Sequence, residues 1–323
     1  MTLSIGKRRS LMECSTSQGV FAILALDQRS SLRKAIKPDN PDTVSYEELV
    51  SFKQHIIKIL APETSAVLLD PEYGAAQNIT ENNIPGSVGL IVAVEETGYT
   101  GDSLARQSQI LKGWDVKKAE MMGANAVKLL VYYHPDSELA DRQCALISEV
   151  AEACRRLDIA LFLEPIVYSI DLNNPKISPI ERREIIVRTA RDLNQLGADV
   201  LKLEFPIDCR VQPEETIWKE ACQEVTEVSK VPWVLLSAGV DYNLYRKQAI
   251  VACTEGASGV MAGRAIWKEA IGLSFTERDA FLRNSAILRI KKLRSICDGL
   301  ANPWITYYPS TPIPENWYLK YSN

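Results

Sequence analysis

Residues 200–206 read VLKLEFP, a run in which two charged residues interrupt an otherwise apolar segment. Side chains of a strand point alternately to its two faces, so Lys202 and Glu204 share one face and three large apolar residues share the other. The apolar face belongs against helices, and the lysine therefore points into the sheet or barrel. Because lysine is seldom fully buried, this segment predicts both a buried parallel strand and a functional site.

Seven more runs of this kind recur along the chain, each separated from the next by enough residues for a helix and a loop. The eight runs cover residues 21–27, 66–72, 89–95, 126–133, 160–168, 200–206, 232–239 and 259–265. Runs that are apolar nearly throughout are typical of parallel strands covered by helices. Eight such units close a (β/α)8 barrel. An open doubly wound sheet is disfavoured, because Asp27 and Gln28 follow the first run in place of a glycine-rich turn.

The intervening segments are amphipathic, and we expect helices at residues 46–60, 107–122, 142–157, 179–196 and 214–228. Gly-Ala steps at Gly123, Gly197 and Gly256 are typical of a left-handed helix cap that leads into a parallel strand. The sequence therefore predicts one α/β domain over residues 1–323, a single TIM barrel. A short N-terminal extension at 1–19 and a C-terminal tail at 297–323 are expected to pack on the barrel or at a subunit contact.

Composition narrows the possible partners. The 37 Lys and Arg residues against 41 Asp and Glu give a net charge near −4, so no global positive field attracts nucleic acid or an anionic membrane. We find neither a signal-peptide core nor a run of 18 apolar residues. The seven cysteines include no Cys-x-x-Cys pair, and with two histidines a histidine-rich metal site is not expected. Free thiols in a reducing cytoplasm are the expectation.

Charged residues at three successive strands point to chemistry at one end of the barrel, where barrel enzymes place their active sites. Lys128 lies in the fourth run, Glu164 in the fifth and Lys202 in the sixth. Burial and a neighbouring cation both favour the neutral amine that a nucleophile needs. A nucleophilic amine, a second cation and a carboxylate are what a Schiff-base enzyme requires. The alternative is that Lys202 is only salt-bridged, with Glu204 or Glu164 as its partner.

The last two runs fit the phosphate site that barrels often build after strands 7 and 8. Ser237 and Gly239 end the seventh run, and Gly263 and Arg264 end the eighth. Small residues let backbone N–H groups approach an anion, and arginine adds a forked charged contact. Each motif alone is also compatible with a tight turn. Because both motifs occur at the strands where barrels bind phosphate, we favour a phosphate site over two unrelated turns.

Further polar residues follow the first three runs. After the first run, Asp27 is placed to contact a sugar hydroxyl, and Arg29 is placed to contact a second anion. The alternative is that this segment forms a helix N-cap with flanking surface charges. Asp70 and Glu72 suggest a metal, but without a nearby histidine we favour a hydrogen-bonded loop. A metal-dependent lyase that uses Asp70, Glu72 and Glu95 remains an alternative, which loss of activity with a chelator would reveal.

At these positions the sequence resembles the class I tagatose 1,6-bisphosphate aldolases. The similar segments are LALDQR at 24–29, LDPEYG at 69–74, ETGY at 96–99, KLLVYY at 128–133, FLE at 162–164, LKLEFP at 201–206, LSAGV at 236–240, GRAIW at 263–267 and Pro303-Trp304. The resemblance implies metal-independent cleavage of a ketohexose 1,6-bisphosphate to dihydroxyacetone phosphate and glyceraldehyde 3-phosphate, without a cofactor. The implied partner is a phosphosugar, and we expect a homo-oligomer, either a dimer or a tetramer.

The resemblance also implies residue roles. Lys202 would form the Schiff base and Glu164 would be the acid/base residue. The residues implied to contact substrate or nucleophile are Lys128, Asp27 and Gln28, and those implied around a phosphate are Ser237, Gly239, Gly263 and Arg264. That Arg29 binds the distal phosphate is a hypothesis of our own.

One segment departs from the family pattern. Glu164-Pro165-Ile166-Val167 is similar to the sulfofructose 1-phosphate aldolases of the same superfamily, which leaves phosphate or sulfonate open as the distal group. The C4 stereochemistry of the ketose is open as well. A catalytically silent phosphosugar-binding regulator is the alternative of another class, and binding without cleavage would identify it.

Overall fold

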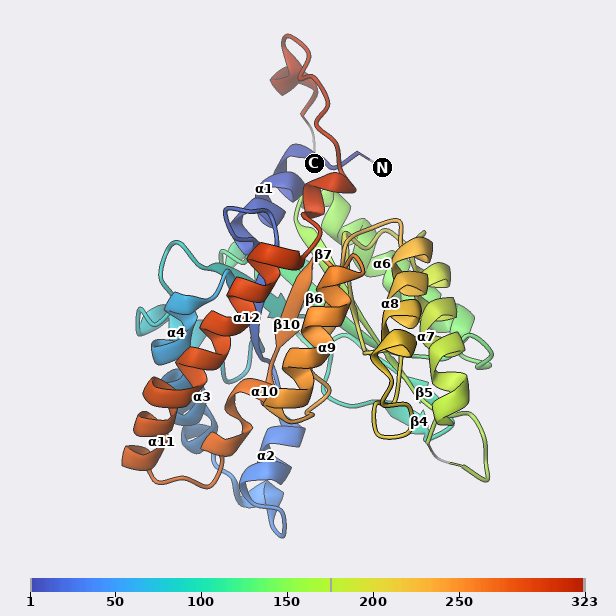
Figure 1. The fold of residues 1–323 in the computed structure, drawn as a ribbon. Helices are drawn as coiled ribbons and strands as arrows, with labels where there is room; N and C mark the ends of the chain where they lie inside the picture. Colours follow the sequence, from blue (N-terminus) through green and yellow to red (C-terminus); the bar gives the residue numbers. More distant parts are fainter. Residues whose placement is uncertain (1, 175, 322–323) are drawn as a thin grey trace.

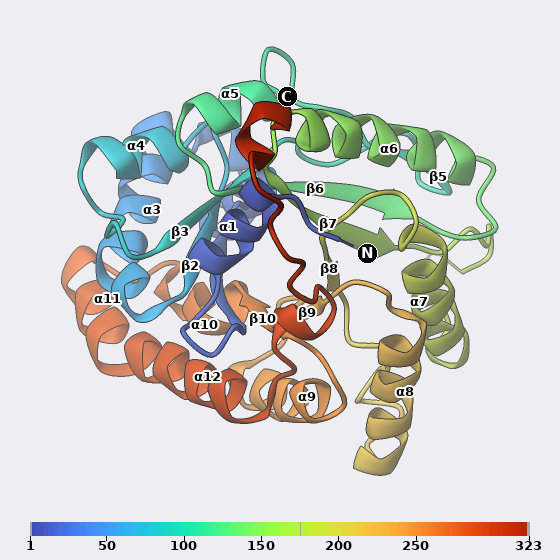
Figure 2. The same ribbon diagram turned by 90° about the horizontal axis from the view of Figure 1, so that it is seen from above.

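Eight parallel strands close into a barrel in the computed structural model, which describes residues 2–174 and 176–321 (Figure 2). The barrel strands are β1 (Phe21–Leu26), β2 (Ala66–Leu69), β3 (Gly89–Ala93), β6 (Ala126–Tyr133), β7 (Ala160–Val167), β8 (Val200–Leu203), β9 (Trp233–Leu236) and β10 (Gly259–Ala262). Their order around the barrel is β1-β10-β9-β8-β7-β6-β3-β2. Every apolar run therefore forms a barrel strand, and the predicted TIM barrel is confirmed.

Most helices form a ring outside the strands, whereas α1 lies over one end of the barrel (Figure 2). The α-helices are α1 (Ile5–Cys14), α2 (Ser30–Ile36), α3 (Tyr46–Leu60), α4 (Ala75–Thr80), α5 (Val116–Met121), α6 (Ala140–Arg156), α7 (Pro179–Leu193), α8 (Glu215–Val228), α9 (Tyr242–Thr254), α10 (Arg264–Trp267), α11 (Phe275–Phe281) and α12 (Ile287–Leu300). The expected left-handed caps are present, with φ of 94° at Gly123, 91° at Gly197 and 108° at Gly256. Among the described residues, no helix combines the length and apolar character needed to cross a membrane.

The helix predicted at 107–122 is wrong over its first half. An antiparallel hairpin, β4 (Thr100–Asp102) and β5 (Ala105–Gln107), extends the loop after β3, and α5 begins only at Val116. Gly113 has a φ of 77°, a left-handed conformation that ends any continuous helix there. Asp115 then caps α5, because its side chain accepts a hydrogen bond from the N–H of Lys118 at 2.8 Å.

Strand register sets which side chains meet inside the barrel. Lys128 pairs with Phe162 between β6 and β7, and Leu163 pairs with Leu201 between β7 and β8. Glu164 and Lys202 are the next residues of their strands and therefore lie at one level. Below them the interior is apolar, and the rings of Phe21 and Phe162 meet edge to face at 5.6 Å. Apolar residues thus fill the lower barrel and charged residues occupy its carboxyl end.

The two chain extensions lie away from that end. In Figure 1, α1 and the C-terminal tail lie at one end of the barrel, and α2 and the β4–β5 hairpin lie at the other. The tail starts later than predicted, because α12 continues to Leu300. Trp304 and Tyr308 are buried, and the Tyr308 hydroxyl donates to the backbone oxygen of Asp199 at 2.9 Å.

Candidate active site

A cavity of about 540 Å³ opens at the carboxyl ends of the barrel strands. The predicted site residues that line it are Asp27, Gln28, Arg29, Lys128, Glu164, Lys202, Ser237, Gly263 and Arg264. Gly239 is not part of the lining and lies directly behind Arg264. Loops after several strands and inward side chains of β6, β7 and β8 thus converge on one cavity, as expected for a barrel.

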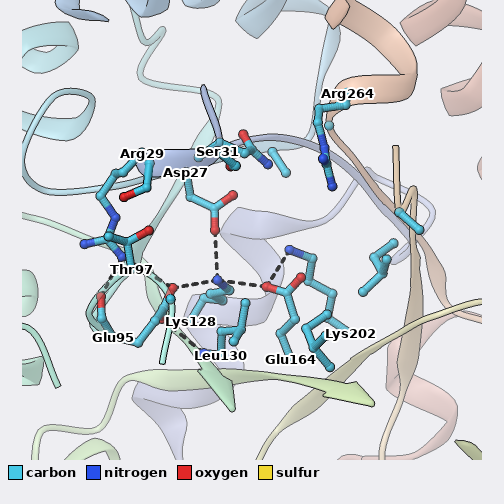
Figure 3. A pocket seen from close by; sticks show the side chains of 18 of the residues that line it. Asp27, Arg29, Ser31, Glu95, Thr97, Lys128, Leu130, Glu164, Lys202 and Arg264 are labelled. Carbon is cyan, nitrogen blue, oxygen red and sulfur yellow. Dashed lines mark hydrogen bonds and ion pairs between the residues drawn. The ribbon is translucent and has the colours of Figure 1, made fainter. Parts of the chain in front are cut away.

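Lys128 is the centre of a buried charge cluster (Figure 3). Its Nζ atom lies 2.8 Å from Oδ2 of Asp27, 2.7 Å from Oε1 of Glu95 and 2.8 Å from Oε2 of Glu164. The Lys128 side chain is only 1% exposed. Burial opposes its charge, but the surrounding carboxylates raise the pKa of Lys128 well above its ordinary value. Lys128 therefore carries a fixed positive charge in this state.

Glu164 connects the two lysines of the cluster. Its Oε2 atom lies 2.8 Å from Nζ of Lys202 and 2.8 Å from Nζ of Lys128 (Figure 3). One carboxylate oxygen thus lies at ion-pair distance from both amines, although neither contact has the angles of a hydrogen bond. Such a carboxylate can accept a proton from Lys202 and leave a neutral amine beside a carboxylic acid, while Lys128 stays charged.

Glu204 does not pair with Lys202, although the two lie on one face as predicted. Its Oε1 accepts from Arg182 at 3.0 Å and its Oε2 accepts from the N–H of Val167 at 3.1 Å. Lys202 does have an ion-pair partner, but that partner is the shared oxygen of Glu164. A purely structural ion pair between Lys202 and Glu164 would not need Lys128 at the same carboxylate oxygen.

Asp27 follows β1 and also lines the cavity. Burial acts to raise its pKa, but the charges of Lys128 and Lys202 hold the pKa of Asp27 well below its usual range. Its Oδ1 atom and Oε1 of the next residue, Gln28, are buried and have no hydrogen-bond partner among the described residues. Two acceptors therefore remain free next to the cavity.

Glu95 was predicted only as part of the alternative metal site and not as a member of the lysine cluster, although it ends the third run and is 4% exposed. Besides Lys128, it accepts a hydrogen bond at Oε2 from the N–H of Leu130 at 3.1 Å. Arg29 donates from Nη2 to the Glu95 backbone oxygen at 2.6 Å and from Nη1 to Glu72 at 2.7 Å. The signal for Glu95 was its place at a strand end, like that of Asp27.

The loops after β9 and β10 form the other end of the cavity. Ser237 Oγ accepts from the N–H of Gly263 at 3.2 Å, which joins the two loops. Gly239 has a φ of 79°, and a Cβ there would lie 3.2 Å from the guanidinium carbon of Arg264. Arg264 is exposed and has no ion-pair or hydrogen-bond partner in the described part of the chain. A free guanidinium between two small-residue loops is suited to an anionic ligand.

The loop after β2 is hydrogen-bonded, as favoured from the sequence. Asp70 forms an ion pair with Lys53, and its Oδ2 accepts from the N–H of Tyr73 at 2.7 Å. Glu72 pairs with Arg29, and Glu95 pairs with Lys128. Within residues 2–174 and 176–321, no three His, Cys, Asp or Glu side chains are grouped to hold a metal ion.

Comparison with known proteins gives the same family as the sequence motifs. The profile of the DeoC/LacD family aldolases matches residues 21–269. A tagatose 1,6-diphosphate aldolase of Listeria monocytogenes is 32% identical over 328 residues, covering 94% of this chain and 95% of the relative. Tagatose 1,6-diphosphate aldolase 2 of Streptococcus pyogenes is 29% identical, covering 94% of this chain and 98% of the relative.

Solved structures share the fold. An archaeal fructose 1,6-bisphosphate aldolase superposes with a TM-score of 0.60 at 19% identity, over 90% of this chain and 98% of the other. A fructose-bisphosphate aldolase of Slackia heliotrinireducens superposes with a TM-score of 0.64 at 16% identity, over 90% and 89% of the two chains. The barrel, the profile match and the 32% identity lead to one conclusion: this chain belongs to the DeoC/LacD family of aldolases and is a lyase.

Proposed function

We propose that this enzyme is a class I aldolase that cleaves tagatose 1,6-bisphosphate to dihydroxyacetone phosphate and glyceraldehyde 3-phosphate through a Schiff base on Lys202. The observation that carries the proposal is the Glu164 oxygen 2.8 Å from Nζ of Lys202. It puts a proton acceptor in contact with the amine that must be neutral to attack a carbonyl. The relatives named tagatose 1,6-diphosphate aldolase support the choice of substrate.

The reaction starts when Glu164 takes a proton from Lys202. The neutral Nζ then attacks the C2 carbonyl of the ketose to give a carbinolamine. Glu164 returns a proton to the departing hydroxyl, water leaves, and an iminium ion remains on Lys202. The Glu164 carboxylate is regenerated in this step and is ready to act as a base.

Cleavage follows at the bond between C3 and C4. Glu164 accepts the proton of the C4 hydroxyl, the bond electrons move into the iminium to form an enamine, and the aldehyde product leaves. The Glu164 carboxylic acid gives a proton to C3 of the enamine, and addition of water to the resulting iminium releases dihydroxyacetone phosphate and restores the amine of Lys202. Lys128 lies 2.8 Å from the Glu164 carboxylate and offsets its charge inside the barrel.

The rest of the cavity would bind the polar ends of the substrate. We assign the free acceptors of Asp27 and Gln28 to sugar hydroxyl groups, because hydroxyls donate to such atoms. Ser237, Gly263 and Arg264 would hold the phosphate next to C1. Lys202 of β8 is on the strand next to β9, whose following loop carries Ser237.

The distal phosphate needs another cation. Arg29 is 4% exposed and bonds Glu72 and Glu95, so few of its donors are free for a ligand. Lys34 of α2 also lines the cavity, is exposed, and has no ion-pair partner in the described part of the chain. We therefore add Lys34 to Arg29 as a candidate contact for the distal anion.

Borohydride trapping with dihydroxyacetone phosphate, in the presence of a chelator, tests the mechanism. The expected result is a covalent adduct that peptide mapping places on Lys202 and that Lys202→Ala abolishes together with turnover. Retained turnover in Lys202→Ala would overturn the scheme. Binding without an adduct or cleavage would favour the silent regulator, and activity that the chelator removes would favour the metal-dependent lyase.

A substrate panel then tests the specificity. We expect cleavage of tagatose 1,6-bisphosphate, measured as triose phosphate release, to exceed cleavage of its C4 epimers. Sulfofructose 1-phosphate is the competing substrate, because Ile166 of the departing segment lines the cavity. Faster cleavage of that compound would reassign the distal group to a sulfonate.

Two expectations about the cellular state belong to the proposal. We propose a cytoplasmic enzyme, supported by seven cysteines that are all free thiols.

We also propose a homo-oligomer, supported by exposed apolar side chains of the tail such as Tyr318 and Leu319. Sedimentation velocity of the full chain and of a chain that ends at residue 310 tests the second point.

A further inference from the structure

Glu95 holds a position in the charge cluster that differs from those of the other two carboxylates around Lys128. Its Oε1 lies 2.7 Å from Nζ of Lys128, and its Oε2 accepts from the backbone N–H of Leu130 at 3.1 Å. Asp27 has a free Oδ1 beside the cavity, and Glu164 contacts Lys202. Both oxygens of Glu95 are therefore engaged within the protein.

Arg29 fixes the backbone at this point. Its Nη2 donates to the Glu95 backbone oxygen at 2.6 Å, and its Nη1 bonds Glu72 at 2.7 Å. These contacts join the loops that follow β1, β2 and β3. Arg29 is 4% exposed and sits 3.9 Å from Oε1 of Glu95, so it also balances the charge of that carboxylate. The Glu95 side chain is thus held from behind as well as by Lys128.

Lys128 needs such an anchor during the reaction. Of its three carboxylate partners, Asp27 and Glu164 face the substrate in the proposed function. When Glu164 is protonated, its attraction for Lys128 weakens, and Asp27 shares its charge with a sugar hydroxyl bound at its free Oδ1. Glu95 is then the one of the three carboxylates that keeps its full charge for Lys128, and an ammonium buried with too little counter-charge would be strongly disfavoured.

We propose that Glu95 is a positioning residue that keeps Lys128 protonated and in place while Glu164 exchanges protons with the substrate. The inference rests on the proposed function, since it assigns the proton transfers to Glu164. Glu95 also lines the cavity, but both of its oxygens are engaged within the protein, so in this scheme it touches neither the substrate nor the reacting atoms. It acts through the amine of Lys128.

The groups that face Lys128 determine the expected pH dependence. They are Asp27 after β1, Glu95 after β3, Glu164 on β7 and Lys202 on β8. The carboxylates favour the proton on Lys128, and the second lysine disfavours it. Removing the charge of Glu95 lowers the pKa of Lys128, so Lys128 should lose its proton at a lower pH during turnover.

Glu95→Gln is the main test, because glutamine has the same size and can still accept from the N–H of Leu130. We expect kcat to fall about ten-fold or more, with KM nearly unchanged and the alkaline limb of the kcat profile moved to lower pH. Glu95→Asp retains the charge and should restore the alkaline limb toward that of the wild type. Glu120→Gln removes an exposed charge on α5, outside the cavity lining, and should leave that limb where it is.

Several outcomes separate this inference from the proposed function. Failure of the wild-type enzyme to form an adduct on Lys202 would remove the proposed function itself. If wild type forms the adduct but Glu95→Gln keeps the wild-type kcat and alkaline limb, the positioning role is wrong. The positioning role is also wrong if Glu95→Asp loses as much kcat as Glu95→Gln and its alkaline limb stays at the lower pH. If Glu95→Gln does not fold, the pH dependence of kcat in Glu95→Asp is the deciding measurement. An alkaline limb at the wild-type pH supports the positioning role of Glu95, and a limb shifted to lower pH contradicts it.

Discussion

Lys53 and Asp70 form an ion pair in which both side chains are 0% exposed, between α3 and the end of β2. Lys53 Nζ also donates to the backbone oxygen of Leu26 at 3.0 Å, directly before Asp27. The pair thus connects the outer helix layer to the strand end that presents Asp27 to the cavity. Taking two charges out of water is costly, and their mutual contact offsets that cost only while both are present.

Lys53→Met is therefore expected to lower the free energy of unfolding by about 3–5 kcal/mol, because it leaves Asp70 as a buried unpaired carboxylate. Urea denaturation of the two proteins measures the difference. Lys58→Met removes an exposed lysine from the same helix and should change stability by less than about 0.5 kcal/mol. Equal stability of the two variants would mean that the Lys53–Asp70 pair contributes little.

The barrel was predictable because buried parallel strands leave a strong apolar signature. Each of the eight runs contains a strand, and α3 has the predicted limits of Tyr46–Leu60. The convergence of Lys128, Glu164 and Lys202 followed from the topology, since the carboxyl ends of barrel strands meet in one place. One fold rule therefore gave both the architecture and the centre of the site.

Contacts between loops were not predictable from the same patterns. The bond from Arg29 to the Glu95 backbone oxygen joins residues 66 positions apart, and no periodicity encodes it. The helix predicted at 107–122 began too early, because Gln107 ends β5 and only residues 116–121 of that range form α5. Gly113 and the capping Asp115 were the local signals that α5 starts later.

Asp27→Asn should reduce stability in a pH-dependent manner. The charges of Lys128 and Lys202 hold the pKa of Asp27 below its ordinary value, so its carboxylate stabilises the fold above about pH 4 and this contribution is lost as the pH falls. We expect the variant to be less stable than the wild type by about 1.5–3 kcal/mol at pH 7, and the difference to narrow toward about pH 2. Urea denaturation at a series of pH values measures it. The exposed Asp39→Asn is the matched control, and a difference independent of pH would contradict the assignment.

Arg264→Ala should weaken binding of the phosphate next to C1. A lost charge-assisted hydrogen bond of about 1.5–3 kcal/mol predicts a KM raised about ten-fold or more, with kcat changed less if the contact is equally strong in ground and transition states. Borohydride trapping separates this effect from a general one. The variant should need more dihydroxyacetone phosphate than the wild type for half-maximal adduct, whereas the two should need the same concentration of unphosphorylated dihydroxyacetone. A shift with both ketones would place Arg264 outside the phosphate site.

Lys34→Ala tests the opposite end of the substrate. Lys34 is exposed, so the loss of its charge should raise the KM for tagatose 1,6-bisphosphate by only about two- to ten-fold. Trapping by dihydroxyacetone phosphate should not change, because that ketone lacks the distal phosphate. Lys37→Ala removes a lysine of the same segment that is paired with Glu48, and it should leave the KM at the wild-type value. If Lys34→Ala weakens trapping by dihydroxyacetone phosphate as well, Lys34 acts on the C1 phosphate beside Arg264. If it changes neither trapping nor the KM, Lys34 does not contact the distal phosphate.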